Sequence, residues 1–156
     1  MTLRLRLACF CAVVLTALAL VPVGAHLAAL PNKIGLPQEP YFVAQGVYRG
    51  WALFGFVLCG ALIANLTLAV MLREQRAPFW LALAAFALIA VTLAVFFAWT
   101  YPANRATSDW TAAPDDWRER RVRWEYSHAV NAVLTFVALC SVTLSTLLAR
   151  DRAVRR

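Results

Sequence analysis

The chain contains two histidines, His26 and His128, and the second lies among side chains that could take part in acid–base chemistry. Glu125 precedes His128 by three residues, so on a helix its carboxylate is close enough to bond the imidazole ring. A histidine with an ordinary pKa of about 6.5 is suited to act as a general base near neutral pH. Asn104 could stabilise the enolate or phenolate that proton removal creates. We therefore predict His128, Glu125 and Asn104 as candidate catalytic residues.

His128 belongs to a stripe of polar and aromatic residues. Separations of four, three, four, three and four residues place all of them on one helix face: Trp117, Arg121, Trp124, His128, Asn131 and Thr135. Polar side chains are costly against lipid, so His128 and Asn131 are expected to face the interior of a helix bundle. The alternative for these two residues is a structural hydrogen bond between helices. The tryptophans could equally belong to the aromatic belt at the membrane surface.

The composition indicates which elements must position this stripe. The 156-residue chain is 62% hydrophobic and 15% charged, whereas a soluble domain is about half apolar and about a quarter charged. Its apolar residues form four stretches longer than the roughly 20 residues that cross a bilayer as a helix, without the alternation of a β-barrel. We predict an all-α protein with one transmembrane domain, residues 1–156, and spans at about 7–30, 50–72, 78–101 and 125–149.

The connections predict an antiparallel, up-down four-helix bundle in the membrane. Only residues 73–76 separate the second span from the third, so these two spans must be antiparallel neighbours. The opposite loops, 31–49 and 102–124, are longer, and their prolines predict an irregular first loop and an end of the third helix at Pro102. Pro114, followed by two aspartates, is typical of a helix start, so the fourth helix should extend beyond the outer membrane surface.

The distribution of charge predicts the orientation and the class of partner. Basic residues are concentrated at the N-terminus, in the 73–76 turn and in the C-terminal tail, which predicts that both termini are cytoplasmic. This topology and attraction to the lipid bilayer explain the net charge of +7, so no nucleic-acid partner is expected. The basic start also resembles a signal peptide, but the apolar run extends to Leu30, and we expect a retained helix in the bacterial cytoplasmic membrane.

Each helix is expected to bring a polar side chain to the outer leaflet. His26 lies near the outer end of the first span, Arg49 precedes the second, and Arg105 follows the third. His26 could instead serve only to cap the first helix. We predict a polar pocket for a small apolar or aromatic ligand, with five binding residues: His26, Arg49, Arg105, Trp124 and Asn131.

"YPANR" closes the third span, and W-x-x-x-H, formed by Trp124 and His128, enters the fourth. These two short motifs resemble the anthrone-oxygenase-like family of small four-helix membrane proteins from bacteria and fungi. The resemblance covers mainly residues 80–150 and implies Pro102, Asn104, Trp124 and His128 as the matched positions. It also implies oxidation of an anthrone to an anthraquinone by molecular oxygen, without metal or flavin.

Three functions are open for these residues. The first is a cofactor-independent oxidoreductase of the anthrone-oxygenase type, although Asn131 stands where that family usually has an arginine. The second is a haem or metal protein in which His26 and His128 are the ligands. The third is a non-enzymatic protein that binds lipid or a small ligand, or that supports a partner subunit or forms a homo-oligomer. No cofactor is predicted for the first function.

Overall fold

The computed structural model describes residues 2–150, which are mostly helical and include no strand. In chain order the elements are α1 (Leu3–Lys33), α2 (Gln38–Gln45), the 3-10 turns η1 (Gly46–Tyr48) and η2 (Trp51–Leu53), α3 (Phe54–Met71), α4 (Arg76–Val95), the π-helical turn η3 (Phe96–Thr100), α5 (Tyr101–Ala106) and α6 (Trp117–Leu148). The prediction of an all-α protein is confirmed.

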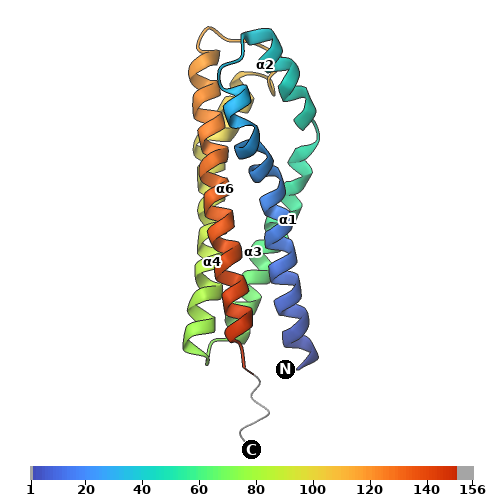
Figure 1. The fold of residues 1–156 in the computed structure, drawn as a ribbon, viewed down its shortest axis with the longest axis vertical. Coiled ribbons are helices and arrows are strands. Elements are labelled where there is room, and N and C mark those ends of the chain that lie inside the picture. The colour runs from blue at the N-terminus through green and yellow to red at the C-terminus, as the bar shows by residue number, and fades with distance from the viewer. Residues whose placement is uncertain (1, 151–156) are drawn as a thin grey trace, which may run out of the picture.

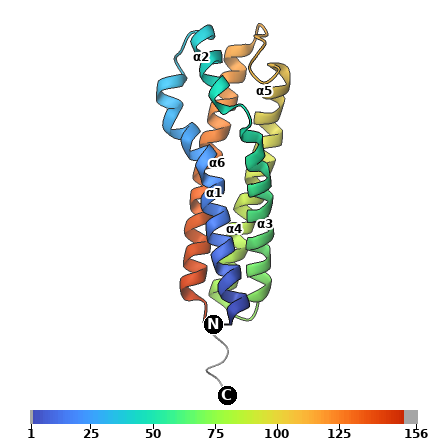
Figure 2. The ribbon, with the colours of Figure 1, turned by 90° about the vertical axis from the view of Figure 1, so that its right-hand side faces the viewer.

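Four long rods run the length of the molecule (Figure 1, Figure 2): α1, α3, α4 with η3 and α5, and α6. α1 packs against α3 and α6, and α4 packs against the same two helices, so the rods close into a ring. Successive rods are antiparallel, which brings the start of α1, the α3–α4 turn and the end of α6 to one end of the bundle. We refer to the opposite end, with α2, η1, η2 and residues 107–116, as the α2 end.

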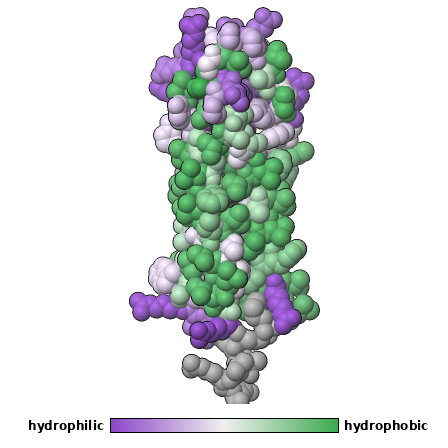
Figure 3. Space-filling view, viewed as in Figure 1, coloured by the Kyte–Doolittle hydropathy of each residue, from purple (hydrophilic) through white to green (hydrophobic). Residues whose placement is uncertain are grey.

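The surface and the interior of the bundle are those of a membrane protein. All four rods are long and apolar enough to cross a membrane, and Figure 3 shows a hydrophobic band between two polar ends. Large apolar side chains are exposed on the rods, among them Phe10, Phe56, Ile63, Val91 and Phe136. The fully buried residues include several alanines, which allow helices in lipid to approach closely. The chain is an integral membrane four-helix bundle, as predicted.

α1 is longer than predicted because a proline does not end it. The helix passes through Pro31 and continues to Lys33, whereas the predicted span ends at Leu30. Proline removes one helical donor, but the next bonds are kept, and the N–H of Ile34 donates to the carbonyl of Leu30. This additional turn brings Lys33 onto the helix face that holds His26.

Two other segments are more helical than predicted. Residues 38–45, expected in an irregular loop, form α2. Pro102 does not end the third rod, which continues through η3 and α5 to Ala106. In η3 the N–H of Tyr101 bonds the carbonyl of Phe96, five residues earlier, and this wider turn accommodates the proline that follows.

α6 shows the predicted extension of the fourth helix. It begins at Trp117, slightly after the expected start at Pro114, and contains 32 residues. At 1.5 Å per residue it is about 48 Å long, which exceeds the hydrocarbon core of about 30 Å. The N–H of Trp117 donates to the carbonyl of Pro114, so the proline forms the turn before the helix. The first turns of α6 stand beside α2 in Figure 1.

Candidate functional site

Side chains from α1, α2 and α6 meet at the α2 end of the bundle. We refer to six of them as the polar cluster: His26, Lys33, Tyr41, Trp124, Glu125 and His128. His26 and Lys33 are seven residues apart on α1, close to two helical turns, so both side chains reach the same contact with α6. His128 is partly buried, and the other five residues are more than nine-tenths buried.

Lys33 and Glu125 form a buried ion pair that joins α1 to α6. Lys33 Nζ lies 3.0 Å from Glu125 Oε1, and the two side chains are 7% and 0% exposed. The Tyr41 hydroxyl donates to the same oxygen over 3.0 Å, and Gln45 Nε2 donates to the Tyr41 oxygen. A buried carboxylate requires such partners, because an unpaired buried charge is strongly unfavourable. The carboxylate of Glu125 therefore ties α1 and α2 to α6.

Tyr41 is held in its neutral form. Burial raises the pKa of its hydroxyl well above the ordinary range, and the negative charge of Glu125 together with the hydrogen bond to that carboxylate raises it further. Arg121 lies over the Tyr41 ring at 5.3 Å and donates from Nη1 to the Leu36 carbonyl over 2.6 Å. Tyr41 is thus a fixed donor to Glu125, and Arg121 holds the chain between α1 and α2 in place.

The two histidine rings stack against each other. Their centroids are 4.2 Å apart and their planes are inclined by 29°. Trp124 meets both rings edge-on, at 4.8 Å from His26 and 4.3 Å from His128, and Tyr48 lies 4.1 Å from His26. Lys33 Nζ approaches His26 Nδ1 to 3.5 Å. The structure therefore brings the two predicted histidines together, with a cation beside one of them.

His128 has no hydrogen-bond partner for its ring. Both Nδ1 and Nε2 are buried, and neither is bonded by any residue in the range 2–150. The expected bond between Glu125 and this ring is not formed: Oε1 of the carboxylate contacts Lys33 and Tyr41, and Oε2 has no partner among the described residues. Since buried polar atoms are rarely left unpartnered, and an imidazole nitrogen with a free lone pair can accept a proton, His128 is the group best placed to act on a ligand.

Asn104 reaches the polar cluster through Trp124. Its Oδ1 accepts the Trp124 Nε1–H over 2.7 Å and the Trp110 Nε1–H over 3.2 Å. Three successive residues with positive φ, 108–110, form the turn that brings Trp110 back to Asn104. The position of Asn104 is therefore that of a residue that orients the Trp124 ring beside the two histidines.

The other predicted binding residues lie apart from the polar cluster. Arg49 and Arg105 are exposed. Asn131 is buried farther along α6. Its Nδ2 donates to the backbone carbonyl of Thr92 over 3.3 Å, and its own backbone carbonyl accepts the Thr135 hydroxyl over 2.7 Å. Asn131 thus links α6 to α4, which corresponds to the structural alternative considered for it.

The polar cluster does not fit a haem bound between the two histidines. Two axial imidazoles must point nitrogen atoms at one iron, whereas His26 and His128 present their ring faces to each other. His26 Nδ1 also faces the ammonium of Lys33, which repels a metal cation. The described residues include no group of three or more His, Cys, Asp or Glu that could hold a metal. The geometry of this cluster therefore gives no support to the haem alternative.

Lys33 and Tyr41 were missed by the sequence-based prediction, because the prolines around them indicate a loop. A signal for Lys33 exists, since the chain has 15 basic residues and all the others are arginines. Tyr41 has no comparable signal, because its burial depends on α2 folding onto α6.

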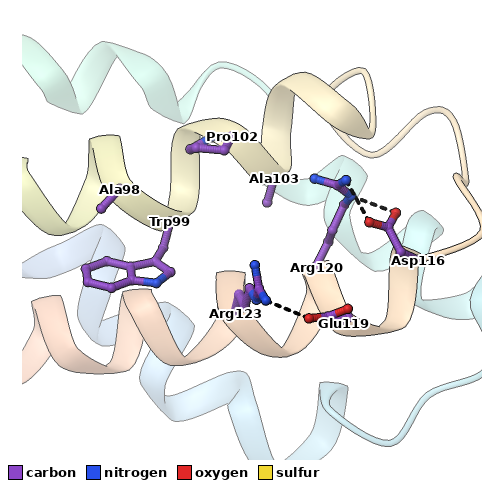
Figure 4. Close-up of a pocket in the computed structure, with 8 residues that line it drawn as sticks. All are labelled: Ala98, Trp99, Pro102, Ala103, Asp116, Glu119, Arg120 and Arg123. Carbon is purple, nitrogen blue, oxygen red and sulfur yellow. Dashed lines mark hydrogen bonds and ion pairs between the residues drawn. The ribbon is translucent and has the colours of Figure 1, made fainter.

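Two surface grooves lie beside α6. Figure 4 shows the first, of about 190 Å³, which is lined by Trp99 and Pro102 from the third rod and by charged residues around the start of α6. Its charged side chains are already paired, Arg120 with Asp116 at 2.7 Å and Arg123 with Glu119 at 2.6 Å. The hydrogen bond from Arg120 lowers the pKa of the Asp116 carboxyl. This groove therefore offers little uncompensated charge to a ligand.

The second groove is apolar and lies between α1 and α6. Its volume is about 330 Å³, and its lining residues are Leu27, Tyr126, Ala129, Val130, Val133 and Leu134. Leu27 and Ala129 directly follow the two histidines in the chain. The groove is thus formed by the same two helices that hold the stacked rings.

Comparisons of the chain with protein-family models, with curated proteins and with solved structures found no match.

Proposed function

We propose that the chain is an oxidoreductase of the bacterial cytoplasmic membrane that oxidises a small anthrone-like phenolic compound with molecular oxygen. The observation that carries the proposal is the His128 ring, which stacks on a second histidine and whose two buried nitrogen atoms have no partner in the described part of the chain. Imidazole is the side chain best suited to remove a proton at neutral pH. The resemblance of "YPANR" and of the Trp124–His128 spacing to the anthrone-oxygenase-like proteins supports the same chemistry.

The charge distribution supports an orientation with both termini in the cytoplasm. Several arginines lie at the start of α1, around the α3–α4 turn and after the end of α6, which is the end of the bundle opposite α2: Arg4, Arg6, Arg73, Arg76 and Arg150. Loops and ends rich in basic residues stay in the cytoplasm. In this orientation the polar cluster lies at the level of the outer leaflet, where an apolar compound dissolved in the membrane can approach it.

The reaction balances with oxygen as the only co-substrate. His128 removes a proton from the CH₂ carbon of the anthrone, and the electron pair left behind is delocalised as a phenolate. Oxygen adds to that carbon, and the histidinium returns its proton to the peroxide oxygen. Loss of water from the hydroperoxide leaves a carbonyl group. One anthrone and one O₂ therefore give one anthraquinone and one water.

The aromatic side chains of the site suit a flat apolar substrate. Trp124 and Tyr48 flank the histidine rings, and aromatic rings stack favourably on a flat π-system. Because the ring nitrogens of His128 are buried, a substrate reaches them by displacing neighbouring side chains. The apolar groove between α1 and α6 supports entry from the lipid phase.

A second candidate function, ligand binding without turnover, is favoured by the same groove. Its apolar lining would suit the acyl chain of a lipid, and such a ligand needs no reaction at His128. Turnover of a phenolic substrate distinguishes the two functions.

Oxygen consumption by the purified protein in lipid nanodiscs, with a hydroxylated anthrone as substrate, tests the proposal. H128Q should lower kcat by about 100-fold or more, because a positioned general base contributes about 10²–10⁴ in rate. V122Q introduces the same side chain at an exposed position of α6 and should keep the wild-type rate. A folded H128Q protein with an unchanged rate would refute catalysis by His128, and binding without turnover in the wild type would favour the second function.

A further inference from the structure

We infer that Lys33 is a positioning residue that fixes the tautomer of His26, so that His26 is a hydrogen-bond donor and His128 is the acceptor of the site. The catalytic importance of these donor and acceptor roles rests on the proposed function, whereas the tautomer of His26 does not. The contact that carries the inference is the 3.5 Å separation between Lys33 Nζ and His26 Nδ1, in a region where both side chains are buried.

The direction of this contact follows from the chemistry of the two groups. An ammonium group has three donors and no acceptor, so the hydrogen bond must run from Lys33 to His26 Nδ1. Nδ1 then uses its lone pair and carries no proton. A neutral imidazole holds its single proton on the other nitrogen. His26 is therefore the Nε2–H tautomer.

Lys33 is held in place for this contact. Its Nζ is 3.0 Å from Glu125 Oε1, and the Tyr41 hydroxyl bonds the same oxygen. The ammonium also lies 4.6 Å from the ring centroid of Tyr48 and 5.3 Å from that of Trp124, at distances typical of cation–π attraction. Glu125 thus acts on the histidines through Lys33, not through a bond to His128.

The aromatic rings around His26 do not change the assignment of its Nε2–H tautomer. Four aromatic rings contact it through their faces or edges: Tyr48, Trp51, Trp124 and His128. The indole N–H of Trp124 already donates to Asn104. Within the described residues, the ammonium of Lys33 is therefore the donor that decides which His26 nitrogen is protonated.

A donor and an acceptor on adjacent rings suit one class of ligand. The hydroxyl of a phenol or an enol has an oxygen that can accept from His26 Nε2–H and a hydrogen that His128 can accept. When the ligand becomes an anion, the same N–H stabilises the charged oxygen. The methyl ether of the same phenol or enol has no hydroxyl hydrogen to donate to His128, so it does not belong to this class of ligand.

Ring-nitrogen NMR tests the inference, because the chain has only two histidines. The full-length protein labelled with ¹⁵N-histidine is measured in nanodiscs at neutral pH, and the H128Q variant identifies the signals of His26. We expect an unprotonated Nδ1 and a protonated Nε2. In K33M/E125Q, which leaves neither charge buried alone, the single tautomer should become a mixture, whereas K33R, which keeps a cationic donor, should retain it.

The exposed ion pair of α6 provides a matched control. E119Q/R123M removes that pair and should leave the His26 signals unchanged. A protonated Nδ1 in the wild type, or an unchanged single tautomer in K33M/E125Q, would overturn the inference without affecting the oxygen-consumption test of His128. If K33M/E125Q does not fold, the wild-type spectrum alone decides the case.

Discussion

Lys33, in the last turn of α1, and Glu125, in the N-terminal part of α6, form an ion pair of 3.0 Å with almost no exposed side-chain surface. Around it are the Tyr41 hydroxyl on one side and the His26 ring on the other. The pair therefore has two roles that can be measured separately. It closes the α2 end of the bundle, and it presents a cation to one of the two stacked histidines.

Replacing Glu125 by alanine should destabilise the protein strongly. It leaves the Lys33 ammonium buried without its counter-ion, and breaking one side of a buried pair costs about 3–5 kcal/mol. K33M/E125Q removes both charges and should recover most of that loss. The free energy of unfolding is measured by SDS titration followed by circular dichroism.

The control for this prediction is Glu119→Ala, which breaks an exposed ion pair on the same helix. Exposed pairs contribute little, so E119A should unfold at nearly the wild-type SDS concentration. Equal losses in E125A and E119A would show that the buried pair is not a structural tie.

Asn104→Ala should destabilise the α5–α6 connection. It leaves the indole N–H groups of Trp110 and Trp124 without their acceptor, and both rings are nearly buried. An unsatisfied buried donor costs about 1–3 kcal/mol. N104D keeps an acceptor oxygen and should lie between N104A and the wild type. A wild-type melting temperature for N104A would contradict the role assigned to Asn104.

Tyr41 should resist ionisation until the protein unfolds. Its folded-state pKa is raised above the value of about 10 for a free tyrosine. Its contribution to stability is therefore fully present below about pH 10 and is lost as the pH rises above that value. Tyrosinate absorbance of the wild type should show a delayed component that appears only as the protein unfolds. Y41F should lack the delayed component, and a delayed component that persists in Y41F would assign it to another tyrosine.

Filling the apolar groove should hinder entry of the substrate without changing the chemistry. Ala129→Trp places a large side chain in the groove between α1 and α6, and we expect KM to rise several-fold with little change in kcat, because uniform binding is lost. Val91→Trp adds the same side chain on the lipid-facing surface of α4 and should have no effect. An unchanged KM in A129W would exclude the groove as the route of entry.

The four rods could be predicted from the sequence because lipid leaves few choices for the backbone. The hydrocarbon core of a membrane contains no water, so the backbone there must satisfy its own hydrogen bonds, and long apolar stretches become helices. The errors lie at Pro31, expected in an irregular loop, and at Pro102, expected to end a helix. In the bundle the helix passes through Pro31, and the wide turn of η3 accommodates Pro102.

The polar cluster could be predicted for its three residues from α6 and for His26 of α1. The four-residue spacing of Trp124 and His128 places both on one helix face, and both meet the bundle interior. The partners of Glu125 could not be found from spacing, since Lys33 and Tyr41 reach it from α1 and α2. Such contacts depend on how the helix ends fold over one another, which local periodicity does not describe.

The most direct test of the proposed oxidation is the fate of oxygen in the product. The purified protein in nanodiscs is given a hydroxylated anthrone under ¹⁸O₂, and the anthraquinone is examined by mass spectrometry beside H128Q and protein-free nanodiscs. Proton removal by His128 predicts one ¹⁸O atom per anthraquinone, formed at least about 100-fold faster with wild type than with H128Q. Formation of the labelled product at equal rates in the wild type and H128Q would contradict a catalytic role for His128.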